Sequence, residues 1–136
     1  MPISRVRVAR QTDRLEDIRH FYGDVLGLAE LGTFEGHAGY SGVFFGLPGR
    51  EHHLEFTHYE RGSQSPPPGP DDLLVLYFHD ASAVDAIVDR LLGAGHEPVQ
   101  PENPYWTTVE DSVTVEDPDG WRIVLVKQGR EQRVPR

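Results

Sequence analysis

The sequence predicts an α+β fold of two βαβββ modules, which form a curved mixed sheet around a cleft with the helices outside. Two observations lead to this prediction. A strand pattern followed by a helix pattern occurs twice, and the acidic residues that open the helices, Asp13 and Asp80, lie about half a chain length apart. A linker rich in Pro, Gly and Ser, residues 62–72, separates the two occurrences.

The first module covers about residues 4–61 and begins with a strand. Residues 4–10, SRVRVAR, alternate polar and apolar side chains, which is typical of a half-buried strand. Asp13 can cap the following helix, with Glu16 completing a capping box, and Gly27 can end it. The helix has apolar side chains at helical spacing: Leu15, Ile18, Tyr22 and Val25. Three more strands are expected, over residues 28–34, 40–47 and 51–58.

The second module covers about residues 73–128 and repeats this order, before a tail of residues 129–136. Its first strand, LLVLYFH, is more apolar, which is typical of a more buried strand. Asp80 or Ser82 can cap its helix. The apolar stripe of that helix is Val84, Ile87, Val88, Leu91 and Leu92, and Gly93 and Gly95 follow it. The remaining strands are expected over residues 96–100, 110–116 and 121–127, with DPDG (117–120) as a tight turn.

Composition excludes several classes of protein. The chain has 136 residues and a formal net charge of −9, without the basic stripe that a nucleic-acid-binding protein would show. No apolar run approaches the ~20 residues of a membrane-spanning helix, and no secretory leader pattern opens the sequence, so we expect a cytoplasmic protein. The absence of cysteine excludes disulfides and zinc–thiolate sites.

Three stretches resemble the vicinal oxygen chelate superfamily, and together they cover nearly the whole chain. They are DRLEDIRHFYGDVLGL (13–28), HHLEF (52–56) and VEDPDGWRIVLV (115–126). This superfamily includes glyoxalase I, extradiol dioxygenases, fosfomycin-resistance transferases and bleomycin-resistance binding proteins. The sequence is most similar in kind to the metal-free bleomycin-resistance branch. One scaffold serves several chemistries here, so the resemblance indicates the fold more directly than the activity.

The resemblance also indicates where a metal would bind. Metal-dependent members take one ligand from the first and one from the last strand of each module, usually His, Glu, His and Glu. These positions correspond to Arg7, Glu55, Leu73 and Val124, and a one-residue slip would bring Asp72 into the third. Since catalytic zinc usually needs three protein ligands, we expect neither metal nor cofactor. The first and last strands of a module are neighbours in this fold, so Arg7 should lie beside Glu55.

The segment REHHLEFTHYE (50–60) contains three histidines and three glutamates, the side chains that hold divalent metals. Alternate residues of a strand point to opposite faces. One face should carry His53, Glu55 and Thr57, and the other His52, Leu54, Phe56 and His58. The three histidines should therefore not converge on one ion.

Aromatic side chains supply the other candidate ligand contacts. We expect Tyr77 and one of Phe44 and Phe45 to line the cleft. The loop PENPYWTT (101–108) should form an aromatic lip from Tyr105 and Trp106, unless Trp106 instead fills the core of its own module. Arg7, His53 and Glu55 would be the polar contacts, unless Arg7 and Glu55 form a plain ion pair.

These residues predict a protein that binds and sequesters a small aromatic, drug- or antibiotic-like molecule, as a resistance-type protein without a catalytic metal. No nucleophile elbow or catalytic triad is present, so no catalytic residue is assigned. Two alternatives stay open. One is a metal-dependent lyase or dioxygenase using His53, Glu55 and Asp72, and the other is a metal-free enzyme of a natural-product pathway. We also expect a homodimer in which the partner abuts or completes each cleft.

Overall fold

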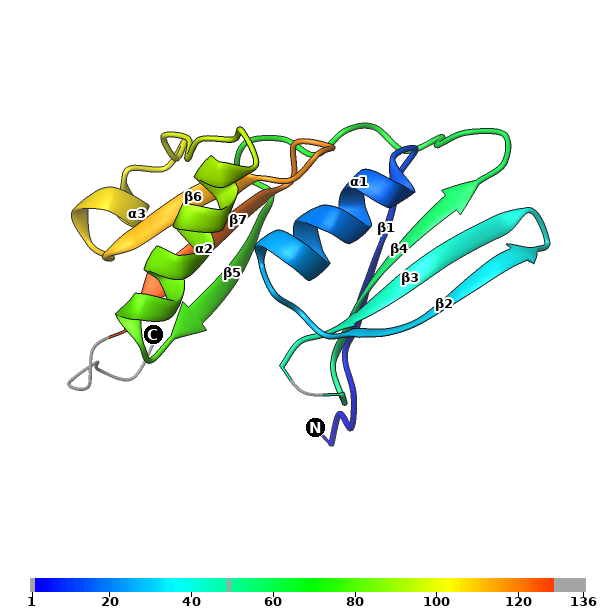
Figure 1. The fold of residues 1–136 in the computed structure, drawn as a ribbon, viewed down its shortest axis with the longest axis horizontal. Helices are drawn as coiled ribbons and strands as arrows, with labels where there is room; N and C mark the ends of the chain where they lie inside the picture. Colours follow the sequence, from blue (N-terminus) through cyan, green and yellow to red (C-terminus); the bar gives the residue numbers. More distant parts are fainter. Residues whose placement is uncertain (1, 49, 129–136) are drawn as a thin grey trace. The chain divides into compact units, whose positions relative to one another are not determined.

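The computed structural model describes residues 2–48 and 50–128, so the predicted tail, 129–136, lies outside the described residues. The chain divides into two compact units, Met1–Pro66 and Pro67–Arg136, and the boundary falls within the Pro-rich stretch 62–72. Each unit has its own small mixed sheet and its own covering helix (Figure 1). None of the helices in the described ranges is long and apolar enough to cross a membrane.

The first unit contains a four-stranded sheet with the predicted strands shifted by up to three residues. The strands are β1 (Arg7–Gln11), β2 (Glu30–His37), β3 (Tyr40–Gly46) and β4 (His53–Tyr59). Their order in the sheet is β1-β4-β3-β2. β1 runs parallel to β4, with Arg7 opposite His53, and the other two pairs are antiparallel. The first and last strands of this module are therefore neighbours.

The helical segment of the first unit changes type along its length. The α-helix α1 (Leu15–Arg19) continues as a π-helix, η1 (His20–Val25), in which the N–H of Leu26 donates to the carbonyl of Phe21. The predicted apolar stripe is buried at Ile18, Tyr22 and Val25. These side chains cover one face of the sheet, where the Tyr22 ring lies 4.5 Å from that of Phe56. Gly27, with φ of 82°, ends the segment as predicted.

The prediction that Asp13 caps this helix is wrong. The N-cap residue is Arg14, and no side chain makes a capping hydrogen bond there. Asp13 Oδ1 instead accepts a hydrogen bond from the Ser63 N–H at 2.9 Å. Thr12 Oγ1 accepts from the Arg14 N–H at 2.9 Å, which turns the chain from β1 into the helix. A sequence-distant bond to the segment after β4 thus replaces the expected local one.

Among its described residues, 67–128, the second unit has three strands where four were predicted. They are β5 (Leu73–Phe78), β6 (Ser112–Glu116) and β7 (Arg122–Lys127), in the order β5-β7-β6 with β5 parallel to β7. The strand expected over 96–100 is reduced to one isolated bridge between Val99 and Thr114. Pro98 and Pro101 flank that bridge, and proline has no N–H to extend a ladder of hydrogen bonds.

Helix α2 (Ala81–Gly93) covers one face of this second sheet (Figure 1). Asp80 caps it as predicted, because its Oδ1 accepts hydrogen bonds from the Ser82 hydroxyl and N–H. These bonds favour the ionised carboxylate and hold the pKa of Asp80 below its ordinary value. Lys127 Nζ lies 3.1 Å from Asp85 of α2, so the helix covers the face on which Lys127 stands.

The predicted DPDG turn joins β6 to β7 and is held by one buried carboxylate. Asp117 Oδ1 accepts hydrogen bonds from the N–H groups of Asp119 and Trp121. Gly120 closes the turn at a φ of 89°, a backbone conformation that glycine adopts readily. Trp121 is buried directly after the turn.

Candidate functional site

The first sheet has a helix-free face, defined here as the face opposite α1 and η1. Strand register places Arg7, Phe34, Phe44, His53 and Glu55 on it. Arg7 is opposite His53, and Phe44 is opposite Glu55. Four of these five side chains were predicted as ligand contacts, and the structure brings them together from three strands.

Arg7 and Glu55 form the predicted pair across the parallel strands β1 and β4. Arg7 Nη1 donates to Glu55 Oε1 at 3.3 Å, and the Arg7 Cζ lies 5.1 Å from the centre of the Phe44 ring. The guanidinium is therefore held by a carboxylate on one side and by an aromatic face on the other. The Glu55 side chain is 13% exposed, whereas that of Arg7 is 49% exposed and open to further partners.

Phe44 and Phe45 point to opposite faces of β3, as expected for neighbours in a strand. Phe45 is fully buried against Tyr22 and Phe56 on the helix-covered face, so it cannot contact a ligand on the helix-free face. Phe44 is half-buried and lies on the helix-free face with Arg7. Of the two alternatives, the structure therefore selects Phe44.

The histidines of the REHHLEFTHYE segment diverge as predicted. His53 Nε2 donates to the Arg50 carbonyl at 2.7 Å, beside the helix-free face. On the other side of the strand, His52 Nδ1 accepts from the Val6 N–H, and His58 Nδ1 donates to the Thr12 carbonyl. Within residues 2–48 and 50–128, no three His, Asp or Glu side chains are grouped as metal ligands would be.

Phe34 is a feature of the helix-free face that pattern reasoning missed. Its ring lies over Gly42 of β3: a Cβ on Gly42 would stand 2.5 Å from Phe34 Cε1 and 2.7 Å from Cζ. The ring centres of Phe34 and Phe44 are 5.7 Å apart. A glycine opposite an aromatic residue on a neighbouring strand was the available signal, but it depends on register, which the β2 bulges displace.

The second unit carries the remaining predicted ligand contacts. Tyr77 is 46% exposed and shares with Leu73 and Val75 the face of β5 opposite α2. The predicted aromatic loop contains a short helix, α3 (Tyr105–Thr108), which is a correction to the sequence analysis.

The aromatic pair of α3 is only partly buried. The rings of Tyr105 and Trp106 meet edge to face with centres 4.9 Å apart. Ser112 Oγ donates to the Trp106 carbonyl at 2.6 Å, which ties α3 to β6. Trp106 is half-buried, so it does not fill a core position in its own unit.

Thr114 of β6 has a buried hydroxyl that makes no hydrogen bond within the described ranges, although the residue is only 2% exposed. Replacing it with Val, which has the same shape without the hydroxyl, is expected to raise the free energy of unfolding by about 1 kcal/mol. Ser112→Ala is the matched control, because it removes a satisfied hydroxyl and should lower stability. Urea denaturation measures both, and a destabilised Thr114→Val variant would contradict the prediction.

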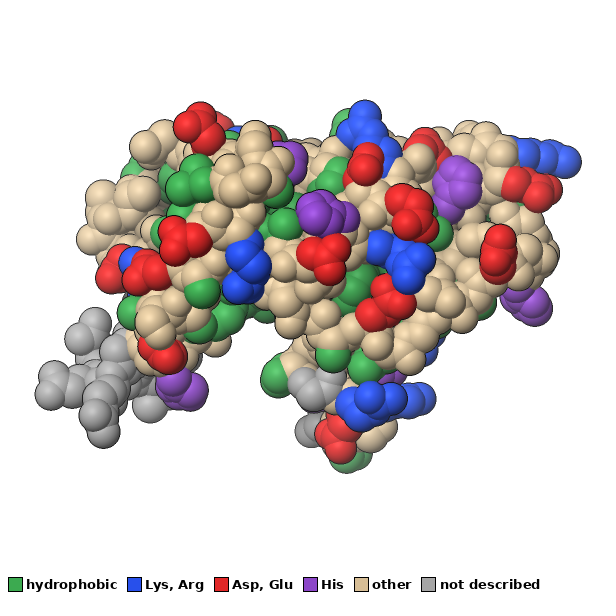
Figure 2. Space-filling view, viewed as in Figure 1, with side chains coloured by type: hydrophobic (Ala, Val, Ile, Leu, Met, Phe, Trp, Pro, Cys, Tyr) green, Lys and Arg blue, Asp and Glu red, His purple; other side chains and the backbone are tan. Residues whose placement is uncertain are grey.

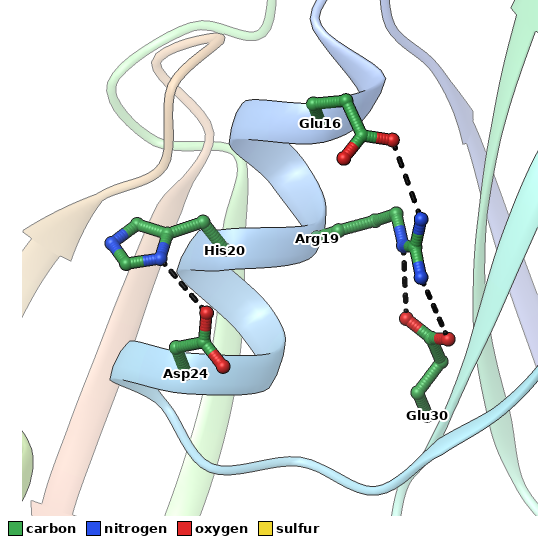
Figure 3. A network of polar contacts seen from close by, with 5 residues as sticks. All are labelled: Glu16, Arg19, His20, Asp24 and Glu30. Carbon is green, nitrogen blue, oxygen red and sulfur yellow. Dashed lines mark hydrogen bonds and ion pairs between the residues drawn. The ribbon is translucent and has the colours of Figure 1, made fainter.

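A shallow hollow of about 500 Å³ lies beside η1, lined by Glu16, Arg19, His20, Gly23, Asp24, Leu28 and Glu30. Its charged groups already pair with one another (Figure 3). Arg19 binds both oxygens of Glu30 at 3.0 Å, which raises the pKa of Arg19, and it contacts Glu16 at 3.3 Å. His20 and Asp24 are 2.9 Å apart.

Figure 2 shows acidic and basic side chains interspersed around α1, as on an ordinary solvated helix face. The polar groups of the hollow satisfy one another, whereas the helix-free face combines an accessible guanidinium with aromatic rings. We therefore place the candidate site on the helix-free face.

The fold and the pairing of first and last strands in each unit define a member of the vicinal oxygen chelate superfamily. More narrowly, the chain belongs to the YycE-like family. Residues 6–57 match the YycE-like N-terminal domain, and residues 71–127 match the YycE-like C-terminal domain.

Sequence and structure comparisons agree on this family. The Bacillus subtilis (strain 168) protein YycE is 49% identical over 123 residues, which are 90% of this chain and 87% of YycE. A crystal structure of a YycE protein from Bacillus subtilis has a TM-score of 0.84 and 46% identity, covering 96% of this chain and 94% of that one. That protein is of unknown function and is grouped with glyoxalase/fosfomycin resistance proteins.

Two more distant structures belong to proteins with different activities. TnmS3, an antibiotic binding protein from Streptomyces sp. CB03234, has a TM-score of 0.62 and 25% identity, covering 93% of this chain and 95% of that chain. The trypanothione-dependent glyoxalase I of Leishmania major has a TM-score of 0.67 and 20% identity, covering 89% of this chain and 84% of that chain. At 20% identity, the similarity to this glyoxalase I shows only that the two proteins share a fold.

Proposed function

We propose that this protein binds and sequesters a small aromatic, drug- or antibiotic-like molecule without a catalytic metal. The observation that carries this proposal is Arg7, a guanidinium where the superfamily resemblance places a metal ligand, held between Glu55 and the Phe44 ring. A fixed cation cannot ligate a metal ion, but it can anchor a polar group of a ligand that stacks on the aromatic rings.

The surroundings of Arg7 support binding more than turnover. Small-molecule sites are usually apolar surfaces with a few converging polar groups, as on the helix-free face. The antibiotic-binding relative TnmS3 shows that this fold can serve such a role. Such a protein would protect its host by holding a toxic molecule in stoichiometric amounts.

The test is binding of a panel of aromatic antibiotics, neutral and cationic, followed by recovery of the bound compound for mass spectrometry. We expect reversible binding, with the compound recovered unchanged. Arg7→Gln should weaken binding by roughly tenfold. Arg19→Gln is the control, because it removes a paired arginine from the helix side and should leave affinity unchanged.

Two results would overturn the proposal. One is a chemically altered product at many turnovers per protein, which would establish an enzyme. The other is about one equivalent of zinc, iron or manganese that Glu55→Ala releases. Homodimer formation is a further part of the proposal, because edge strands such as β2 need protection. Sedimentation showing only monomer at micromolar concentration would contradict it.

A further inference from the structure

We infer that the ligand is a planar aromatic molecule with a hydrogen-bond acceptor oxygen next to an N–H or O–H donor on one edge. It would stack on the Phe34 ring, beside Phe44, with that edge against Arg7 and Glu55. This inference rests on the proposed function and deepens it. It adds Phe34 and Gly42 as residues that determine specificity.

Gly42 and Phe34 together make the platform. A Cβ on Gly42 would overlap the Phe34 ring at 2.5 and 2.7 Å, so the ring occupies the space that a side chain on β3 would fill. Phe34 and Phe44 are both half-buried, with ring planes inclined by 39°. Arg7 lies over the Phe44 ring, so the neighbouring Phe34 ring is the apolar surface on which a planar molecule can stack in offset geometry.

The ion pair beside the platform selects the polar edge. Among the described residues, the Arg7 guanidinium donates one hydrogen bond, from Nη1 to Glu55. Its remaining N–H groups can donate to an acceptor oxygen of the ligand. Glu55 accepts that bond through Oε1, and its Oε2 makes no hydrogen bond to the described residues. The pair therefore offers donors and an acceptor side by side while its charges cancel.

A neutral pair discriminates against charged ligand edges. A carboxylate on the ligand would be attracted by Arg7 but repelled by Glu55. An ammonium group would be attracted by Glu55 but repelled by Arg7. A carboxamide or lactam edge satisfies both partners at once. His53 does not compete for the ligand with its Nε2–H, because that group is committed to the Arg50 carbonyl.

The experiment compares three probes of one shape by isothermal titration calorimetry: 2-naphthamide, methyl 2-naphthoate and 2-naphthoate. We expect 2-naphthamide to bind about tenfold more tightly than either of the others. Glu55→Gln should remove most of its advantage over the ester. Phe34→Leu should weaken all three probes without changing their order, whereas Phe34→Tyr should keep the platform and the affinities. Arg19→Gln is the control and should change nothing.

Contrary results separate this inference from sequestration itself. Tightest binding of 2-naphthoate, equal binding of all three, or no binding at millimolar concentration would each overturn the inference. So would Phe34→Leu and Phe34→Tyr variants that both fold and bind like the native chain. The antibiotic panel tests sequestration independently, because sequestration requires only that some aromatic compound binds and is recovered unchanged.

Discussion

Replacing Phe45 with Ala is expected to lower the free energy of unfolding by about 3–5 kcal/mol, whereas Phe44→Ala should cost only about 1 kcal/mol. The two residues are adjacent in β3 and identical in chemistry. Phe45 has no exposed surface and packs against Tyr22 and Phe56 under the helical segment, so its loss leaves a cavity in the core. Phe44 is half-buried on the opposite face, where its loss removes part of the platform.

Equilibrium denaturation in urea measures both costs, and the titrations described above measure the effect on binding. Phe44→Ala should reduce affinity for aromatic probes while the protein stays folded. If the two variants were equally destabilised, the assignment of Phe44 to the helix-free face would be wrong.

Gly42→Ala is expected to destabilise the first unit by about 2–3 kcal/mol. The added methyl group would stand 2.5 Å from Phe34 Cε1 and 2.9 Å from the Phe56 carbonyl oxygen, which are distances that real Cβ atoms do not adopt. The ring can move away, but the carbonyl belongs to the backbone of β4 and cannot. Binding of aromatic probes should fall as well, because the Phe34 ring on which they stack is displaced.

A double-mutant cycle separates the two contacts. In a Phe34→Ala background the cost of Gly42→Ala should be smaller by about 1 kcal/mol, because only the carbonyl clash remains. Gly32→Ala is the control, since Gly32 lies in β2 with nothing within 4 Å of its added methyl group. Equal costs for Gly42→Ala in both backgrounds would show that Phe34 does not rest on that glycine.

Local patterns in the sequence predict most of the strands and most of the buried stripe of each helix, although Leu92, predicted in the stripe of α2, is exposed. Ile18 and Tyr22 are buried because helical spacing brings them to one side, and period-two alternation separates Leu54 from Glu55 in the same way. These features depend on residues close together in the chain, so periodicity detects them. The DPDG turn with its glycine is likewise predicted from residues that are adjacent in the chain.

Features that depend on distant partners were predicted poorly or only through family resemblance. The local sequence predicts Asp13 as a helix cap, but its carboxylate instead accepts a hydrogen bond from the N–H of Ser63, fifty residues later. The strand expected at 96–100 fails because Pro98 has no N–H for a neighbour. The Arg7–Glu55 pair joins residues 48 positions apart, and only the resemblance placed them side by side. The Phe34 platform needed a strand register that bulges had shifted.

The parallel pairing of first and last strands has a consequence for the order of folding. β1 meets its partner β4 with Arg7 opposite His53, and β5 meets β7 with Leu73 opposite Arg122, so each closure spans nearly fifty residues of chain. Contacts between such distant segments form late and slow the search for the native state. During synthesis, β1 must therefore wait unpaired until β4 has left the ribosome. It does not have to wait for the second unit, so the first sheet can close while the second is still being made.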